Sequence, residues 1–148
     1  MLVNIHNIKT QVEVSTPEEA IIACGTQLIE SGLVRDSYIH AMIDVFHQLG
    51  AYIVIAPHVA LPHASPDNGA IASGICITSL KNPIYFGHQD NDPVHVLIGL
   101  ASHDGISHIE TLQKMAEFLS LEENISKLIN CQTESEIKNL FVENTNDN

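Results

Sequence analysis

Residues 55–64 read IAPHVALPHA and place the His63 imidazole on a stiffened loop directly after an apolar, strand-like run. The ring of Pro62 fixes its own φ and restricts Leu61 to extended geometry, so His63 leaves the run on a rigid support. Histidine is the side chain best suited to exchange protons or to carry a group near neutral pH. The proline-clamped histidine therefore predicts a positioned chemical group at His63.

On both sides of this stretch, the hydrophobic pattern indicates an α/β fold. Upstream, Thr16-Pro17-Glu18-Glu19 carries the residues that begin a helix, and Gly32 ends it. A second helix is expected between Asp36 and Gly50. Short apolar runs rich in β-branched residues, each bounded by Pro, Gly, Asn or Asp, predict strands at residues 52–55, 74–80, 84–86 and 94–101.

Three capping boxes after the last of these runs predict three further helices. They pair Ser107 with Glu110, Ser120 with Glu123, and Thr133 with Glu136. Two helices, about four strands and then three helices are best packed as a mixed sheet covered by helices. The fold class expected is α/β: a single domain over residues 1–148, with a mixed β-sheet of about four to five strands flanked by about five helices. The tail at residues 143–148 is expected to be frayed.

The chain holds nine histidines, four of which form two similarly spaced pairs. His58 precedes His63, and His103 precedes His108, by the same interval. His63 and His108 each follow the end of a predicted strand, where loops gather into sites. With Ser107 as the expected N-cap, His108 lies in a first helical turn whose free amides favour an oxyanion or phosphate. The two histidines together would form a phosphoryl-sized site; alternatively, His108 is a polar residue at an exposed helix start.

The composition excludes several classes of partner. The formal net charge is −12 at pH 7, and only six residues are Lys or Arg. No basic patch is available to neutralise nucleic-acid phosphates, and an anionic membrane surface is equally disfavoured. We expect no nucleic acid, no direct membrane insertion, and a partner with a basic or neutral docking face.

The cysteines and the N-terminus indicate a cytoplasmic protein. Cys24, Cys76 and Cys131 are far apart and form no Cys-x-x-Cys pair, which favours buried thiols in a reducing compartment. No basic segment followed by an apolar stretch opens the chain, and no run reaches the ~20 apolar residues that span a bilayer.

Other site chemistries find less support. Four histidines with Asp104 could bind zinc, but the His-x-x-x-His spacing of helical ligands is absent. A Ser/His/Asp hydrolase would need a Gly-x-Ser-x-Gly elbow, and direct nucleotide binding a Gly-x-x-x-x-Gly-Lys-Ser/Thr loop; the chain has neither.

Four motifs together give a family resemblance. They are YIVIAP at residues 52–57, ALPHA at 60–64, LIGLA at 97–101 and DGISHI at 104–109. Across residues 16–141 the chain resembles the mannitol/fructose-type (type 2) enzyme IIA domain of the bacterial phosphoenolpyruvate-dependent sugar phosphotransferase system. It looks closest to the ascorbate-specific subgroup.

The resemblance implies a phosphotransferase that works through a phosphohistidine and needs no cofactor. His63 would accept a phosphoryl group from the histidine phosphocarrier protein and pass it to a cysteine of the cognate enzyme IIB, which serves the membrane enzyme IIC. His108 would be the supporting donor, and the family suggests Nε2 of His63 as the phosphorylated nitrogen. Such a transfer asks mainly for positioning and charge stabilisation, which two histidines can supply.

Two positions depart from the family pattern. Mannitol-type members usually have an arginine sixteen residues before the acceptor, where this chain has His47. A shorter, titratable group replaces a permanent cation there, so His47, like Ser107, is expected only as a contact behind the reacting pair. His58 stands where the ascorbate subgroup commonly has glycine, and is either an incidental surface residue or an added polar group at the rim.

Two alternatives stay open besides the sugar phosphocarrier. The chain could be an enzyme IIA-like regulatory protein whose affinity for a target changes on phosphorylation, or, less well supported, a zinc-binding hydrolase. Ascorbate rests on subgroup likeness, with galactitol, fructose and a pentitol as alternatives.

Overall fold

A four-stranded mixed sheet organises the computed structural model, which describes residues 5–145. The strands lie in the order β1-β3-β4-β2. The central strands β3 and β4 are antiparallel, whereas β1 runs parallel to its neighbour β3 and β2 runs parallel to its neighbour β4. The strands are β1 (Ile5–Val12), β2 (Val59–Ala60), β3 (Gly74–Ile84) and β4 (Val94–Ala101). The helices are α1 (Pro17–Glu30), α2 (Ser37–Leu49), α3 (Gly105–Leu119), α4 (Glu122–Asn130) and α5 (Glu134–Thr145), with 3-10 turns η1 (Gly50–Ile53) and η2 (Pro66–Asn68).

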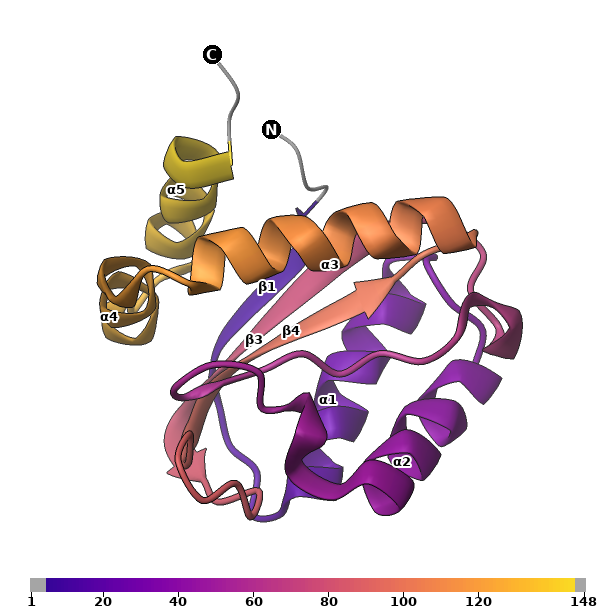
Figure 1. Cartoon of the computed structure of the whole chain (residues 1–148), viewed down its shortest axis with the longest axis horizontal. Helices are drawn as coiled ribbons and strands as arrows, with labels where there is room; N and C mark the ends of the chain where they lie inside the picture. The colour runs from indigo at the N-terminus through magenta and orange to yellow at the C-terminus, as the bar shows by residue number, and fades with distance from the viewer. Residues whose placement is uncertain (1–4, 146–148) are drawn as a thin grey trace.

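The helices cover both faces of the sheet. In Figure 1, α1 and α2 lie on one side of β3 and β4, and α3 runs across the other side towards α4 and α5. Alternation along the central strands supplies both cores: Cys76 and Leu97 join the core beneath α1 and α2, whereas Ile77 and Ile98 join the one beneath α3. The class predicted from the sequence, an α/β fold with a mixed sheet and five helices, is confirmed.

A buried polar network links α1 to the sheet. The side-chain amide of Gln27 donates to Asn7 Oδ1 at 2.8 Å and to the Ile77 carbonyl at 3.0 Å, and its oxygen accepts from the Thr78 hydroxyl. Gln27 and Thr78 are almost fully buried, so each satisfied polar group avoids a desolvation cost of about 1–3 kcal/mol. The network fixes the register of α1 over β1 and β3.

Two expected strands differ from the structure. Residues 50–53 form the 3-10 turn η1 instead of a strand at 52–55, because Gly50 (φ 63°) turns the chain and leaves Tyr52 outside the sheet, 71% exposed. The runs at 74–80 and 84–86 are mostly one strand: β3 continues to Ile84 through a register shift after Ser79.

The sequence analysis also missed β1. This edge strand buries only Ile8 among its eight residues, so it has no apolar run to mark it. At the other end of the chain, α5 continues to Thr145, into the tail for which fraying was predicted; residues 146–148 lie outside the described range.

The helix starts test the predicted caps individually. Thr16 accepts from the Glu19 amide at 3.1 Å and Thr133 from the Glu136 amide at 3.2 Å, as predicted. The other two caps are wrong by one to three residues: Asp104 caps α3 instead of Ser107, and Leu121, without a side-chain bond, precedes α4 instead of Ser120. Asp104 prevails because its carboxylate reaches the Ser107 amide at 2.7 Å.

Within residues 5–145, none of the helices combines the length and the apolar character that crossing a bilayer requires. All three cysteines are free thiols; Cys24 and Cys76 are buried and Cys131 is partly exposed.

Candidate functional site

His63 lies just past β2, on a segment tied to its neighbours through the main chain. Val59 and Ala60 pair with β4, the Leu61 amide donates to the Ile53 carbonyl at 2.8 Å, and the Leu100 amide donates to the Pro62 carbonyl at 3.1 Å. The proline has no amide hydrogen of its own to satisfy here. The segment therefore leaves the sheet in one direction, with the His63 ring at its end.

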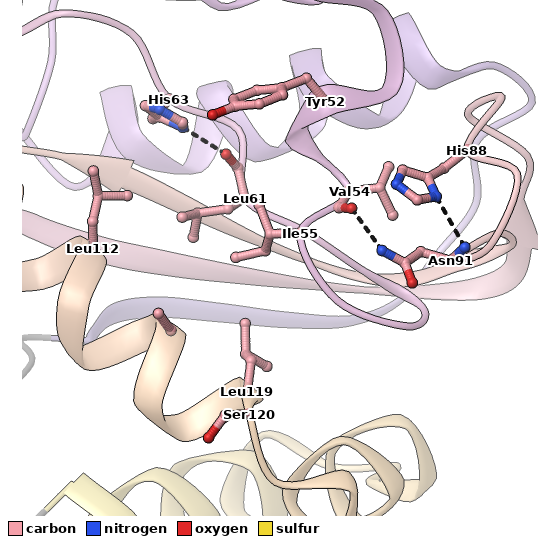
Figure 2. Close-up of a pocket in the computed structure, with 11 residues that line it drawn as sticks. Tyr52, Val54, Ile55, Leu61, His63, His88, Asn91, Leu112, Leu119 and Ser120 are labelled. Carbon is pink, nitrogen blue, oxygen red and sulfur yellow. Dashed lines mark hydrogen bonds between the residues drawn. The ribbon is translucent and has the colours of Figure 1, made fainter.

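The tautomer of His63 follows from one hydrogen bond. Its Nδ1 lies 2.7 Å from the Leu61 carbonyl oxygen, and Figure 2 shows this contact as a dashed line. A carbonyl oxygen only accepts, so the hydrogen resides on Nδ1 and donates to it. Nε2 is left with its lone pair, which makes it the nucleophilic nitrogen of this half-buried ring.

His108 faces His63 from the first turn of α3. The two ring centroids are 5.5 Å apart and the rings are tilted by 47°. With Asp104 as N-cap, His108 is the fourth residue of the helix, and its amide donates to the Asp104 carbonyl at 3.2 Å. The structure therefore brings together one histidine from each sequence pair.

The surroundings of His108 keep its ring neutral. Burial lowers its pKa, and the neighbouring charge of His63 lowers it further. Its Nδ1 is buried and has no hydrogen-bond partner among the described residues. A hydrogen on Nδ1 would be a buried unpaired donor, so the tautomer with the hydrogen on Nε2 is favoured. His108 can thus offer one Nε2–H to an oxyanion beside the rings.

A hydrogen-bonded cluster holds the start of α3. Asp104 accepts from the Ser107 amide at 2.7 Å and from His103 Nε2 at 2.8 Å. Nδ1 of His103 lies 2.7 Å from the Ser73 hydroxyl, which is 3.1 Å from that of Ser107. These bonds, with the Ser107 amide first, lower the pKa of Asp104. Ser107 and His103 therefore secure the turn that carries His108.

Two other histidines of the sequence analysis lie elsewhere. His58 has φ 70°; its Nδ1 is 2.8 Å from the Pro93 carbonyl and its ring lies 5.1 Å from that of His95. His47, at the end of α2, bonds Glu18 at 3.1 Å through Nε2. The pKa of Glu18 is lowered by its own backbone hydrogen bond first and by His47 second. A supporting role for His47 stays a prediction.

A largely apolar cavity of about 690 Å³ opens beside His63. Figure 2 shows Tyr52 and Ile55 from the chain around η1 on one side and Leu112 and Leu119 from α3 on the other. Asn91 also lines the cavity, where its side-chain amide donates to the Val54 carbonyl at 3.0 Å. The sequence analysis missed this cavity, because η1 contributes to its wall and the apolar run at 52–55 had predicted a strand there.

Large apolar side chains are exposed at the cavity and beside His108 in the sequence. Tyr52 is 71% exposed, and Ile106 and Ile109, which flank His108 along α3, are 74% and 58% exposed. Large apolar groups in water around a reactive pair are typical of a protein-docking surface. Within the described part of the chain, no group of three or more His, Cys, Asp or Glu is placed to hold a metal ion.

Comparisons with known proteins identify relatives of this chain. Residues 1–144 match the family described as phosphoenolpyruvate-dependent sugar phosphotransferase system, EIIA 2. The ascorbate-specific PTS system EIIA component of Escherichia coli (strain K12) is 36% identical over 136 residues, which cover 91% of this chain and 88% of that protein.

Two solved structures share the fold. The mannitol-specific cryptic phosphotransferase enzyme IIA CmtB from Escherichia coli superposes with a TM-score of 0.77 at 30% identity, covering 96% of this chain and 92% of that one. In the complex of enzyme IIA mannitol with phosphorylated enzyme IIB mannitol from Escherichia coli, the matching chain gives a TM-score of 0.80 at 24% identity, covering 93% and 95%. The chain belongs to the EIIA type 2 family of the phosphoenolpyruvate-dependent sugar phosphotransferase system, whose members are phosphotransferases of sugar transport.

Proposed function

We propose that this protein carries a phosphoryl group on His63, from the histidine phosphocarrier protein to a cysteine of the cognate enzyme IIB. The observation that carries the proposal is the His63 ring, whose Nδ1–H is engaged by the Leu61 carbonyl while His108 lies 5.5 Å away. The Nε2 lone pair forms a bond to phosphorus as the N–P bond of the donor phosphohistidine breaks. A cysteine thiolate of enzyme IIB then attacks the phosphorus, and the electron pair returns to Nε2.

His108 supports both transfers as a donor. In both transition states, negative charge lies on the phosphoryl oxygens, and a fixed N–H aimed at them contributes most where water is excluded. A phosphoryl dianion on His63 would replace a like-charged neighbour with an opposite charge. We expect the pKa of His108, lowered in the free protein, to rise on phosphorylation.

The surface around the pair suits the two protein partners in turn. Tyr52, Ile106 and Ile109 offer apolar contacts, and the net charge of −12 attracts partners with basic rims. An enzyme IIB partner is further supported by the fold shared with the IIA chain of the IIA–IIB mannitol complex. Enzyme IIC would be served indirectly, and this chemistry would take place in the cytoplasm.

Ascorbate is the sugar that the relatives favour. The ascorbate-specific component is 36% identical to this chain, compared with 30% for the mannitol-specific CmtB. We expect the phosphorylated protein to transfer its phosphoryl group to an ascorbate-type enzyme IIB at least tenfold faster than to a mannitol- or galactitol-type one. Equal rates would remove the ascorbate assignment, and failure to transfer to any enzyme IIB cysteine would favour the regulatory role.

The acceptor itself is tested by phosphorylation with phosphoenolpyruvate, enzyme I and the histidine phosphocarrier. The wild type should gain one phosphoryl group, and His63→Ala should gain none. His58→Asn is a matched control, because asparagine tolerates the positive φ of this position (70°) and the change removes a nearby imidazole. It should label at the wild-type rate; full labelling of a folded His63→Ala variant would refute the proposal.

A further inference from the structure

Tyr38 is a buried tyrosine whose hydroxyl contacts the main chain beside the acceptor. It is the second residue of α2 and is 0% exposed. Its hydroxyl oxygen lies 2.8 Å from the Leu100 carbonyl, 3.0 Å from the Ala64 carbonyl and 3.0 Å from the Ala64 nitrogen. A phenylalanine would fill the same space in the core, so the hydroxyl needs a separate explanation.

The hydrogen-bond roles follow from the atoms present. The Ala64 amide donates to the hydroxyl oxygen, and the single O–H is shared between the carbonyls of Leu100 and Ala64, with the shorter contact to Leu100. Burial raises the pKa of Tyr38 to about 12, so the group stays a donor throughout the neutral range. Tyr38 thus bridges the residue after His63 to the end of β4.

The same strand end holds the residue before His63. The Leu100 amide donates to the Pro62 carbonyl at 3.1 Å, while its carbonyl accepts from Tyr38. His63 therefore lies inside a closed circuit of main-chain contacts that runs from Pro62 through Leu100 and Tyr38 to Ala64. The main chain of His63 is therefore held on both sides, at Pro62 and at Ala64.

We propose that Tyr38 is a positioning residue for the phosphoryl acceptor. By fixing the main chain at Ala64, its hydroxyl holds the His63 ring where Nδ1–H meets the Leu61 carbonyl and Nε2 keeps its lone pair. Tyr38 contacts neither the phosphoryl group nor the reacting nitrogen. The inference rests on the proposed function for its effect on transfer, but its effect on the His63 tautomer holds in the unphosphorylated protein.

The test compares Tyr38→Phe with Thr78→Val. Both remove one buried hydroxyl, and that of Thr78 donates to Gln27 between α1 and the sheet. Both variants should unfold at lower denaturant concentration. Only Tyr38→Phe should slow single-turnover phosphorylation, by about tenfold, with an unchanged KM for the phosphorylated carrier.

The distinguishing measurement is ¹⁵N NMR of the His63 ring without phosphorylation. Wild type and Thr78→Val should show the Nδ1–H tautomer, whereas Tyr38→Phe should show a mixture of tautomers. An unchanged tautomer and an unchanged transfer rate in Tyr38→Phe would overturn the inference, even if His63 is the acceptor. If His63→Ala labels fully but Tyr38→Phe shifts the tautomer, the proposed function fails and the positioning role stands.

A measurement on the wild type covers the case in which Tyr38→Phe does not fold. The Ala64 amide, buried against the Tyr38 oxygen, should exchange with deuterium as slowly as the amides of β4. Rapid exchange at Ala64, or a His63 ring already mixed between tautomers in the wild type, would contradict the inference.

Discussion

At His63, a single main-chain carbonyl decides which ring nitrogen keeps its lone pair. The Leu61 oxygen, two residues back, takes the Nδ1 hydrogen at 2.7 Å. Pro62 restricts Leu61 to extended geometry, which limits the directions this oxygen can take. The sequence could identify His63 from the preceding proline, but the free nitrogen depends on side-chain torsions that residue identity alone does not determine.

His108 offers the clearest prediction at the scale of one residue. We expect His108→Ala to slow single-turnover phosphorylation of His63 by about 100-fold, because it removes the N–H beside the phosphoryl oxygens. His108→Gln should lose less, since its amide can place an N–H near the position of Nε2. Rapid-quench transfer from the phosphorylated carrier measures both rates.

The stability of these variants serves as the control. Neither change should unfold the protein at 25 °C, because the first turn of α3 is held by Asp104 and Ser73 as well. A His108→Ala rate within twofold of the wild type would show that His108 does not assist the transfer.

At the scale of secondary structure, burial decides what the sequence could predict. β4 was predicted with its observed bounds because seven of its eight residues are buried, and all but His95 are apolar or glycine. β1 was missed because an edge strand with one buried residue has no such run, and η1 was taken for a strand because its apolar residues do not reveal the turn at Gly50. The α3 cap was misplaced because Asp104 and Ser107 are both good caps and only geometry separates them.

The Asp104 cap yields a prediction at this scale. Asp104→Ala should lower the free energy of unfolding by about 1 kcal/mol, because it removes the cap of α3 and its contact with the Ser107 amide. Ser120→Ala is the matched control: Ser120 was predicted as a cap, but in the structure it follows α3 and bonds only the Glu117 carbonyl. It should change stability by less than about 0.5 kcal/mol in urea unfolding, and an equal loss in both variants would contradict the assignment of the cap.

At the scale of the whole molecule, the sheet brings the two histidines together. His63 and His108 are far apart in sequence; they meet because β2 pairs in parallel with β4, and the chain then leaves β4 directly into α3. Their positions after predicted strands, together with the family resemblance, could suggest this meeting. Spacing alone does not determine strand order, so the sequence could not establish it.

Stability should depend on pH through two partly buried histidines, His95 and His108. Burial lowers the pKa of His95 and His108, and a neighbouring histidine lowers each further. At pH values between the lowered pKa of these histidines in the folded protein and their ordinary pKa near 6.5, the unfolded chain binds more protons than the folded one. Their contribution to the free energy of unfolding is therefore complete above about pH 6.5 and is lost as the pH falls.

Urea unfolding at pH 7.5 and 5.5 tests this dependence. Protonation also reduces the repulsion that accompanies a net charge of −12, which acts in the opposite sense, so the comparison uses a variant. We expect the His95→Gln/His108→Gln double variant to lose less stability than the wild type between these two values. Identical losses would show that the two rings do not resist protonation in the folded protein.

The single lone-pair nitrogen of His63 limits the proposed relay to one partner protein at a time. Donor and recipient proteins approaching one reactive nitrogen from the same side exclude each other sterically. Each cycle must therefore include dissociation of one partner protein before the next one binds. An excess of unphosphorylated carrier protein should competitively inhibit phosphoryl transfer to enzyme IIB.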